Sequence, residues 1–578
     1  MFFDCESRYD PSAPVQEHTF RLAVAVYVKL DTTLNVISRT VYHADIPENL
    51  WDFIVKIVNR TDTVTLIAHN AGFDLRVSRG LPILASRGWS AVKLHDDCGA
   101  CYVCWKKGRR SIKLYDSARI LRASIEALGR MLNLPKLPQP GVEDDDGKWR
   151  EYCLRDVEIL EQAVYAWIKF LQHHDLGNFC PTLASQAYHT YRYKFMREDL
   201  YSSRDPEIVE MEYEAYRGGR SEAFFLGEVR GKNLYKLDVN SMYPYVMLEY
   251  HHPVRPLWIC EDVSVQKLRE LSNSYWLIVD ADIVTTEPFL AVRRNGKLLF
   301  PVGRIRAILC GEEVTYALAH NYVRAVRKAI IYRRAKPFDA YVKFFWNLRQ
   351  KAKSEGDTVT EQNCKLLLNS LYGKFGERMR ESYVEKVHDD VGWKYEILVD
   401  TATGRRGILK CLGNTTIATF TTGPAYFAVP AIAASVTAGA RIYLWQLMLA
   451  AGLENVYYVD TDSLIVNEKG YHHLAQHISN TELGKLKLEK ASDYLHIRNV
   501  KDYVMGEEIK LKGRGKVVEQ IDDNTFRVER WQGLRGALRQ GIIDKVIVVT
   551  RPWRRVTTYK KGVVKEEGRI YPLVFSDF

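Results

Sequence analysis

Two aspartates one residue apart interrupt an apolar stretch of the chain, YYVDTDSLIV at residues 457–466. Valine, tyrosine and isoleucine favour strands, so the stretch predicts a β-hairpin with Asp460, Thr461 and Asp462 at its bend. Two carboxylates on one tight bend repel each other and favour a bound cation. Mg²⁺ takes oxygen ligands of this kind when a substrate phosphate completes its shell. A solvated turn explains such a triplet equally well when it stands alone.

Two further stretches favour the cation site over the solvated turn. Residues 236–244, KLDVNSMYP, predict a strand that carries Asp238 near its end and turns at Pro244. Residues 365–373, KLLLNSLYG, predict a helix with a cation, an amide and an aromatic ring on one face: Lys365, Asn369 and Tyr372. Acidic strand ends beside such a helix can hold a nucleoside triphosphate, with a metal on the phosphates and the ring under the base.

The three stretches resemble motifs A (DxxSLYP), B (KxxxNSxYG) and C (YxDTDS) of family B DNA polymerases, with Met242 where motif A usually has leucine. Their order and spacing are similar to those of the protein-primed subgroup of bacteriophages, linear plasmids and adenoviruses. The resemblance covers nearly the whole chain. It implies a DNA-directed DNA polymerase with two Mg²⁺ ions per active site, for which Mn²⁺ can substitute, replicating a viral or linear-plasmid genome with strand displacement.

The resemblance also implies roles for individual residues. Asp238 and Asp462 would ligate both metal ions, and Asp460 would support them. Lys365 would contact the triphosphate, and Tyr243 would lie under the sugar and exclude a ribose 2′-hydroxyl. The implied metal ligands are Asp238, Val239 and Asp462, and the implied nucleotide-binding residues are Ser241, Tyr243, Lys351, Asn369, Tyr372, Gly373 and Thr461. For Lys351, a solvated helix face is an equal alternative.

Four acids in the N-terminal part of the chain could converge at a strand edge: Asp4, Glu6, Asp74 and Asp156. Each alone is typical of a surface acid. Together they resemble the motifs Exo I (DxE), Exo II (Nx₃D) and Exo III (Yx₃D) of 3′–5′ proofreading exonucleases. The resemblance implies a ribonuclease H-like domain whose acids hold two metal ions. Tyr152 would orient the attacking water, and Asn70 and Phe73 would hold the single-stranded primer end.

Three further segments predict contacts with DNA. YRGG at residues 216–219 resembles the YxGG segment, which in the family contacts the template and helps to balance synthesis against editing; an ordinary turn is the alternative. Lys501 and Tyr503 match the KxY motif near the primer terminus, where Lys501 would steady the primer end. The basic loop 510–516 offers cations to phosphates. The predicted DNA-binding residues are Asn70, Phe73, Tyr216, Gly218, Gly219, Tyr503, Lys512 and Arg514.

Strand and helix patterns predict a multidomain protein of the α/β and α+β classes. The resemblance implies a ribonuclease H-like exonuclease domain, then a right-hand polymerase with palm, fingers, thumb and two insertions. The predicted bounds are 1–185 for the exonuclease domain, 186–255 and 413–497 for the palm, 338–376 for the fingers, 256–337 and 377–412 for the insertions, and 498–578 for the thumb. The insertions resemble terminal-protein regions, the first docking the priming protein and the second encircling DNA. A β-hairpin with no DNA role is the alternative for the second.

Composition and charge favour a nucleic-acid partner. The 578 residues have a formal net charge of +11 and include 34 tyrosines, which suits contacts to phosphates and stacking on bases. The most apolar segment, residues 426–452, is cut by Arg441 and Gln446, which predicts a buried helix and no membrane span. We expect a monomer that binds template-primer DNA, deoxynucleoside triphosphates and a terminal protein. Asp4 and Glu6 argue against a signal peptide, so we expect the host cytoplasm or a virion-associated replication site, not secretion.

The cysteines leave one metal site open. Cys98, Cys101 and Cys104 form a CxxCxxC run, but no fourth ligand follows at a suitable spacing, so a strand with incidental thiols is favoured. Two other functions also stay open. One is a family B polymerase that starts from an ordinary nucleic-acid primer or from none. The other is a nucleic-acid-binding protein without catalysis.

Overall fold

The predicted hairpin lies within a seven-stranded sheet of the computed structural model, which describes residues 1–95, 101–387 and 390–576. The strand order is β24-β23-β22-β9-β21-β20-β8. The strands are β8 (Ser221–Ala223), β9 (Gly227–Val239), β20 (Val456–Asp460), β21 (Ser463–Asn467), β22 (Leu486–Asn499), β23 (Asp502–Met505) and β24 (Glu508–Leu511). The antiparallel pair of β20 and β21 confirms the predicted hairpin, and β9 pairs with β21.

The predicted turn at Pro244 is wrong. The chain turns at residues 240–241, and Pro244 lies in the first turn of helix α9 (Met242–Glu249). Proline fits there because the first turn of a helix does not need its missing N–H. The strand end that carries Asp238 is therefore followed directly by a helix.

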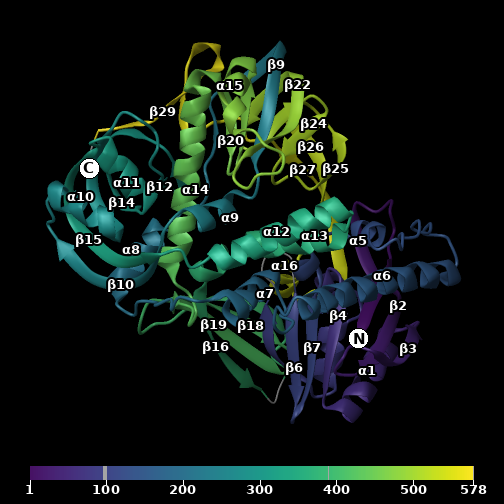
Figure 1. The fold of residues 1–578 in the computed structure, drawn as a ribbon. Helices are drawn as coiled ribbons and strands as arrows, with labels where there is room; N and C mark the ends of the chain where they lie inside the picture. The colour runs from purple at the N-terminus through teal and green to yellow at the C-terminus, as the bar shows by residue number, and fades with distance from the viewer. Residues whose placement is uncertain (96–100, 388–389, 577–578) are drawn as a thin grey trace.

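One long apolar helix, α14 (Pro430–Ala451), runs through the middle of the molecule (Figure 1). It packs beside α9, α11 (Glu312–Ala319) and α15 (Glu468–His473), and its side chains share the main core with those of β20 and β21. By length and composition it could cross a membrane, but 83% of its most apolar window is buried inside the protein. A helix that is apolar all round belongs in a core. The prediction of a buried helix at residues 426–452 is confirmed.

The N-terminal part forms a ten-stranded sheet in the order β25-β26-β27-β2-β1-β4-β7-β6-β5, with β3 paired to β2. Its strands are β1 (Phe2–Arg8), β2 (Val15–Leu30), β3 (Val36–Ala44), β4 (Thr63–Ala68), β5 (Ser90–His95), β6 (Tyr102–Lys107), β7 (Arg110–Asp116), β25 (Lys516–Gln520), β26 (Thr525–Trp531) and β27 (Val546–Arg554). Phe2 and Phe3 point to opposite faces of β1 and join different cores, one with α6 and one with α1. Both faces of the sheet are therefore covered.

Helices connect and cover this sheet and lead out of it. They are α1 (Pro47–Thr61), α2 (Ala71–Val77), α3 (Gly80–Ser86), α4 (Ala118–Leu121), α5 (Ile125–Met131), α6 (Asp146–His173), α7 (Leu183–Thr190) and α8 (Pro206–Ala215). The longest, α6, packs along β1 and β2. Asp145 caps its N-terminus by accepting from two backbone N–H groups.

Two smaller sheets occupy the predicted insertions. The first, in the order β10-β15-β11-β14-β30, consists of β10 (His252–Glu261), β11 (Trp276–Thr285), β14 (Val302–Cys310), β15 (Val323–Ala335) and β30 (Val574–Phe575), with α10 (Val265–Ser274), α11 and the hairpin β12 (Val292–Arg294) and β13 (Lys297–Leu299). The second, in the order β16-β19-β18-β17, consists of β16 (Arg378–Lys386), β17 (Trp393–Val399), β18 (Arg406–Leu412) and β19 (Thr415–Pro424). Helices α12 (Asp339–Glu355) and α13 (Thr358–Ser370) pack together between them in sequence.

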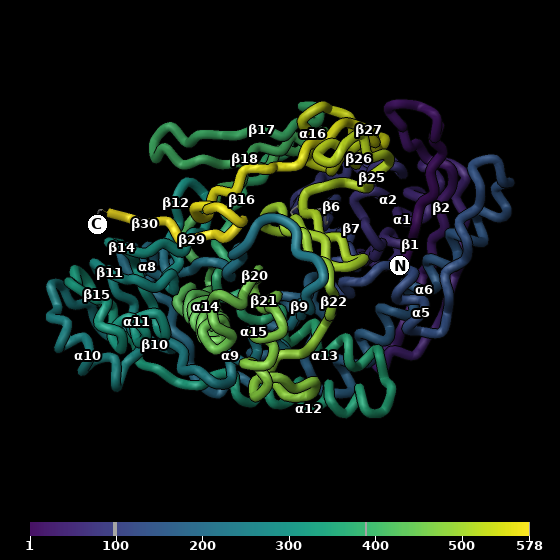
Figure 2. Tube along the Cα trace, turned by 90° about the horizontal axis from the view of Figure 1, so that it is seen from above, coloured from purple at the N-terminus to yellow at the C-terminus, as the bar shows by residue number. Residues whose placement is uncertain are grey.

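Two predicted boundaries are wrong for these sheets. The second insertion does not end at 412, because β19 continues its sheet to Pro424 and pairs with both β16 and β18. The segment 498–578 is not a single unit. β23 and β24 extend the seven-stranded sheet, β27 pairs with β2, and β30 pairs with β14; a further hairpin is β28 (Gly562–Val564) with β29 (Ile570–Pro572). An unpaired sheet edge can pair with a strand from any part of the chain. Strands of this segment lie in three different sheets, and Figure 2 shows the segment running across the molecule.

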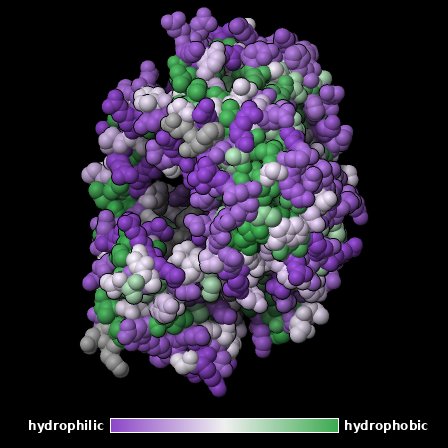
Figure 3. Space-filling model, turned by 90° about the vertical axis from the view of Figure 1, so that its left-hand side faces the viewer, coloured by the Kyte–Doolittle hydropathy of each residue, from purple (hydrophilic) through white to green (hydrophobic). Residues whose placement is uncertain are grey.

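The surface on the side of the first insertion is mostly hydrophilic, with scattered hydrophobic side chains and a hollow (Figure 3). Scattered apolar groups are ordinary on a protein surface.

Candidate functional site

The bend between β20 and β21 lies beside the end of β9. Asp238 is the register partner of Ser463, and the Val239 N–H donates to the carbonyl oxygen of Asp462 at 2.8 Å. Thr461 adopts a left-handed backbone with φ of 67°, which closes the tight turn between the flanking acids. The structure therefore brings three predicted acids together at what we call the hairpin site: Asp238, Asp460 and Asp462.

Burial and repulsion raise the pKa of two of these acids. The pKa of Asp238 is raised to about 7, first by desolvation and then by the charge of Asp462. Desolvation likewise raises the pKa of Asp462 to about 6. Ser221 Oγ donates to Asp460 at 2.6 Å and Lys501 Nζ lies 3.1 Å from the same oxygen, so the charge of Asp460 has partners within the protein. Asp238 and Asp462 thus form the uncompensated pair, which a divalent cation would neutralise.

A cavity of about 600 Å³ opens on the hairpin site. Its lining is Lys236, Asp238, Asp460, Thr461, Asp462, Ser463, Glu489, Lys501, Tyr503, Lys510, Leu511 and Lys512. Sequence reasoning missed Glu489 and the role of Lys236, whose Nζ lies 3.0 Å from the Glu489 carboxylate. Glu489 falls at a bulge in β22 opposite β9, and bulges re-aim side chains toward sites. No sequence signal marks that bulge.

The motif B residues lie on α13 and the short helix η3 (Tyr372–Gly376). Lys365, Asn369 and Gly373 are exposed, and the charge of Lys365 lowers the pKa of Asp238. The ring centroids of Tyr243 and Tyr372 lie 4.4 Å apart. A second cavity of about 460 Å³ adjoins these rings, lined by Tyr213, Tyr216, Arg217, Gly218, Gly219, Tyr243, Arg293, Tyr372, Gly376, Arg378 and Thr437. An aromatic floor beside a lysine and two acids suits a nucleotide.

Lys351 is placed unlike the other predicted nucleotide-binding residues. Its side chain is 69% exposed and its Nζ lies 3.9 Å from Glu355 one turn away, which agrees with the solvated helix face. Arg349, which sequence reasoning missed, instead donates to Ser241 Oγ at 3.3 Å from the same helix. Two residues along a helix turn the side chain to another face, so Arg349 is the cation on the side of the hairpin site.

The YRGG loop, residues 216–219, packs between the hairpin bend and η3. The Thr461 N–H donates to the Arg220 carbonyl oxygen at 2.6 Å. A Cβ on Gly219 would lie 2.9 Å from Thr461 Cγ2, so only glycine allows this approach. A Cβ on Gly376 would lie 2.4 Å from the Tyr216 ring. The loop therefore touches both the acids' turn and the helix that carries Tyr372.

Four predicted acids converge in the N-terminal sheet at what we call the N-terminal site: Asp4, Glu6, Asp74 and Asp156. Desolvation, followed by the charge of a neighbouring acid, raises the pKa of Asp4 to about 7 and that of Glu6 to about 9. Asp74 Oδ1 accepts from the Cys5 N–H at 3.0 Å, but Asp74 Oδ2 and Asp156 Oδ1 are buried without a partner. Buried unpartnered carboxylate oxygens call for a cation.

Three further residues complete this site. Lys136, which sequence reasoning missed, pairs with Asp156, and its Nζ lies 4.3 Å from the Tyr152 ring centroid. Cys153, also missed, has its Sγ 3.7 Å from Asp4 Oδ2. The sulfur and the acids Asp4 and Glu6 lie close enough for one ion to reach all three. Lys136 could not be placed from sequence because it lies twenty residues before Asp156, on a loop without periodicity.

The predicted DNA-binding residues are spread around both sites. Asn70 lies at the start of α2 with φ of 68°, and its N–H donates to Asp116. The Phe73 ring lies 6.2 Å from Trp531. Near the hairpin site, the Tyr503 ring lies 5.1 Å from Tyr458, the Lys512 N–H donates to the Lys501 carbonyl oxygen, and the Arg514 guanidinium lies 5.6 Å from the Phe526 ring. Cys101 and Cys104 are buried, whereas Cys98 lies outside the described residues, so the favoured interpretation of incidental thiols stays a prediction.

Parts of this sequence are similar to known proteins. Residues 133–402 match the family described as DNA polymerase type B, organellar and viral. A probable DNA polymerase of Neurospora intermedia is 25% identical over 364 residues, which are 59% of this chain and 35% of that protein. The DNA-directed DNA polymerase of Enterobacteria phage PRD1 is 28% identical over 310 residues, 50% of this chain and 49% of that protein. The chain spans less than half the length of either relative.

The fold is also shared with a solved structure. Phi29 DNA polymerase, complexed with primer-template DNA and incoming nucleotide substrates, superposes with a TM-score of 0.68 at 16% identity, covering 96% of this chain and 100% of that one. The family match over residues 133–402, the phage relative and the shared fold support the resemblance to protein-primed family B DNA polymerases that the three motifs carry.

Proposed function

We propose that this chain is a DNA-directed DNA polymerase with a 3′–5′ proofreading exonuclease. One observation carries the proposal: two separate groups of desolvated acids, each with raised pKa values, lie on different sheets of one chain. Perturbed acids in a cavity are typical of catalytic sites. The hairpin site adds a lysine and an aromatic pair that suit a nucleoside triphosphate. The N-terminal site offers acids and one lysine, which suits hydrolysis of a phosphodiester.

The donor atoms of both sites fit hard divalent cations. Asp238 and Asp462 would hold Mg²⁺ at the hairpin site, with the Val239 carbonyl beside them, and Mn²⁺ would serve in its place. At the N-terminal site the unpartnered oxygens of Asp74 and Asp156 are free for a metal, together with Asp4 and Glu6. Bound there, the ions would lower the pKa of the attacking oxygen and neutralise phosphate charge.

Side chains of the chain would position the substrates of synthesis. Lys365 would contact the triphosphate, and Asn369 and Gly373 line the same exposed face. Tyr243, whose ring contacts that of Tyr372 at a tilt of 30°, would support the sugar and exclude a 2′-hydroxyl. Lys501, which holds Asp460, would steady the primer end. At the N-terminal site, Tyr152 would orient water while Lys136 offsets part of the acidic charge.

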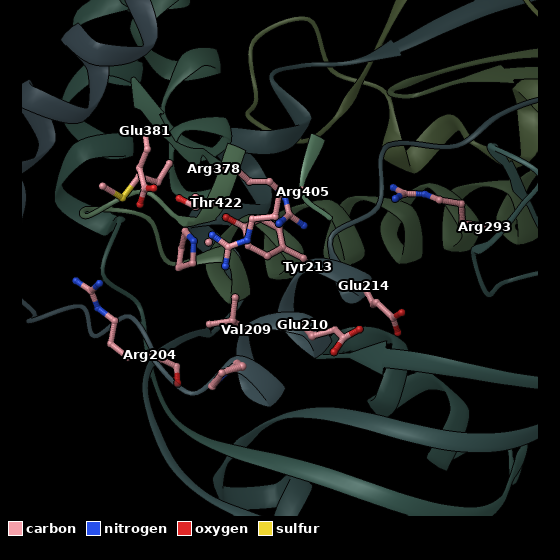
Figure 4. Close-up of a pocket in the computed structure, with 15 residues that line it drawn as sticks. Arg204, Val209, Glu210, Tyr213, Glu214, Arg293, Arg378, Glu381, Arg405 and Thr422 are labelled. Atoms are coloured by element: carbon pink, nitrogen blue, oxygen red, sulfur yellow. The ribbon is translucent and has the colours of Figure 1, made fainter. Parts of the chain in front are cut away.

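A larger cavity would guide the template strand to the hairpin site. Its volume is about 770 Å³, and it lies between α8 and the second insertion (Figure 4). It shares Tyr213, Arg293 and Arg378 with the cavity beside Tyr243, and the Arg378 guanidinium lies 3.6 Å from the Tyr213 ring. Arginines with an aromatic ring suit the phosphates and bases of a single strand. Figure 4 shows Arg378 and Arg405 reaching in from the second insertion toward Tyr213 on α8.

Protein priming is the finer part of the proposal. The first insertion, as a sheet with its own helices beside the palm, would dock a terminal protein, and the second insertion would encircle DNA and support strand displacement. We infer a monomer that replicates a viral or linear-plasmid genome in the host cytoplasm or at a virion-associated site. A polymerase that starts from a nucleic-acid primer, or from none, is the second candidate. The two are distinguished by transfer of a labelled deoxynucleotide onto a candidate protein.

Primer extension tests the central proposal. The purified chain, given Mg²⁺, four deoxynucleoside triphosphates and a labelled primer on a longer template, is expected to extend the primer to the template end. Without nucleotides it is expected to shorten the primer. No extension by folded protein would contradict polymerase activity, and a non-catalytic binding protein would shift the DNA on a gel without changing its length.

A further inference from the structure

A buried ion pair joins the first insertion to the core helix. Arg441 on α14 and Glu313 on α11 are buried, and the Arg441 Nε and Nη2 atoms lie 3.1 and 2.8 Å from the same Glu313 oxygen. Figure 1 shows the two helices side by side, and they are in contact. Apolar residues of similar size would stabilise such a position equally well or better, because both charges lose their hydration. The pair is therefore expected to serve a purpose other than stability.

The third nitrogen of Arg441 shows that purpose. Its Nη1 donates to the carbonyl oxygens of Arg217 and Gly218, at 2.8 and 2.9 Å. One guanidinium thus holds a carboxylate of the insertion on one edge and two carbonyls of the YRGG loop on the other. Arg217 adds a second tie, because its own Nη1 donates to the Ile308 carbonyl oxygen in β14 at 2.8 Å.

The residues that directly follow the loop form hydrogen bonds to the bend between β20 and β21. The Arg220 carbonyl oxygen accepts from the Thr461 N–H, and Ser221 Oγ donates to Asp460. Gly218 and Gly219 have no side chains, so carbonyl contacts are the means by which this part of the loop can be fixed. Residues 216–221, which are the YRGG loop together with Arg220 and the first residue of β8, thus connect Arg441 to the turn that carries Asp460 and Asp462.

We propose that Arg441 is a positioning residue: held by Glu313 of the first insertion, it fixes loop 216–221 and through it the turn of the hairpin site. The inference rests on the proposed function, because residues 216–219 line the cavity beside Tyr243, and that cavity shares lining residues with the larger one in which we place the template. It assigns the first insertion a second task besides docking a partner. The insertion sets how firmly the template side of the hairpin site is held, and hence how a primer end divides between synthesis and trimming.

The decisive variant replaces both charges at once. Arg441→Met with Glu313→Met removes both charges of the pair, but it leaves the buried Arg217, whose Nη1 lies 4.0 Å from Glu313, without that carboxylate, so a moderately lower thermal midpoint is expected. Loss of two charge-assisted hydrogen bonds to the loop is expected to weaken template-primer binding on the order of tenfold. Amide hydrogen exchange in peptides covering 216–221 and Thr461 is expected to speed up. Trimming of single-stranded DNA is expected to be unchanged, so the products shift toward degradation.

Matched variants separate positioning from general damage. Arg327→Met with Asp282→Met removes an ion pair of the same insertion, 2.9 Å apart, that does not touch the loop, and no change in exchange at 216–221 is expected. Arg441→Lys tests the geometry, because a compact ammonium lacks the planar spread by which the guanidinium reaches Glu313 on one edge and the two carbonyls on the other; an intermediate loss is expected. If the double methionine variant misfolds, the lysine variant carries the test.

Two results overturn the inference. One is a folded Arg441→Met/Glu313→Met protein that binds template-primer DNA as tightly as the wild type. The other is unchanged amide exchange in the loop. A wild-type protein that never extends a primer contradicts the proposed function instead, and the exchange measurement still decides whether Arg441 fixes the loop.

Discussion

The two acidic sites differ in how much of their charge the protein itself neutralises. At the hairpin site, Asp460 is matched by Lys501 and Ser221, which leaves Asp238 and Asp462 facing a cavity with further lysines on its rim. At the N-terminal site one lysine serves four acids, and two carboxylate oxygens are buried without any partner. The hairpin site is thus prepared for a highly charged substrate. The N-terminal site depends more on bound cations.

The raised pKa values point the same way. Those of Asp238 and Asp462 are about 7 and about 6, whereas those of Asp4 and Glu6 are about 7 and about 9, so the difference lies in Glu6. Desolvation comes first in each case, and the closely spaced acids Asp4 and Asp156 raise the pKa of Glu6 further. Without a metal, the acids of the N-terminal site therefore repel one another more strongly than those of the hairpin site, where the protein neutralises part of the charge. The predictions below test that difference.

Removing one acid from each site is expected to have the largest effect. Asp462→Ala should lower primer extension on the order of 10³-fold and leave trimming intact, because a metal ligand supplies several kcal/mol to the transition state. Asp4→Ala should do the reverse. Both activities are measured on one labelled primer-template, with and without nucleotides. Loss of both activities in either variant would mean that the two groups of acids do not work separately.

The choice of sugar is expected to belong to the hairpin site alone. Tyr243→Ala should raise incorporation of ribonucleotides relative to deoxynucleotides on the order of 10²-fold, because the space under the sugar is no longer filled. Trimming of a DNA end should not change. Tyr245→Ala, two residues along the same helix and facing Tyr443, is the control. An unchanged sugar preference in Tyr243→Ala would exclude the steric role.

The dependence of stability on pH should separate the sites without any substrate. Because the folded-state pKa of Glu6 lies above its ordinary value, the metal-free fold binds a proton that the unfolded chain releases, so stability falls as pH rises from about 4.5 to about 9. Asp238 and Asp462 titrate by about pH 7 and add little above it. Between pH 7 and 9, the free energy of unfolding of the metal-free wild type should fall by about 2 kcal/mol more than that of Glu6→Gln.

Chemical denaturation in a chelating buffer measures this loss. Added Mg²⁺ should remove most of it in the wild type, because the ion replaces the proton as the partner of the acids. Equal slopes for wild type and Glu6→Gln would show that the N-terminal acids are neutralised by something other than protons or metal.

Residues whose role is local could be predicted from the sequence, and residues brought in by pairing could not. Asp460 and Asp462 share one bend, and Lys365 and Asn369 share one helix face, so short-range pattern places them. Ser221 and Glu489 reach the same site through strand register alone, from positions more than two hundred residues apart. Nothing in their own neighbourhoods marks them as part of a site.

Pairing between distant strands also explains why two of the predicted domain boundaries are wrong. Segment 498–578 has the short strands expected of a small domain, but β23, β27 and β30 pair with strands formed elsewhere and so divide the segment among three sheets. Strand composition indicates that a strand exists and leaves its partner open. The boundary at 412 failed likewise, because the turn at 413–414 leads into a fourth strand of the same sheet. The buried helix α14 was predicted because its apolar run is long and continuous.

The smallest effects should come from the lysine of each site, and they test the comparison most directly. Lys501 pairs with Asp460, which is not a predicted metal ligand, so Lys501→Met should weaken primer binding about tenfold and leave Mn²⁺ affinity unchanged. Lys136 pairs with Asp156, which is a predicted ligand, so Lys136→Met should slow trimming while Mn²⁺ binds more tightly, since the carboxylate no longer has a competing cation.

Lys510→Met, on the rim of the hairpin cavity, is the control. Calorimetric Mn²⁺ titration of the three variants decides: equal affinities for Lys136→Met and wild type would mean that Asp156 holds no metal, and that the N-terminal site is as self-neutralised as the hairpin site.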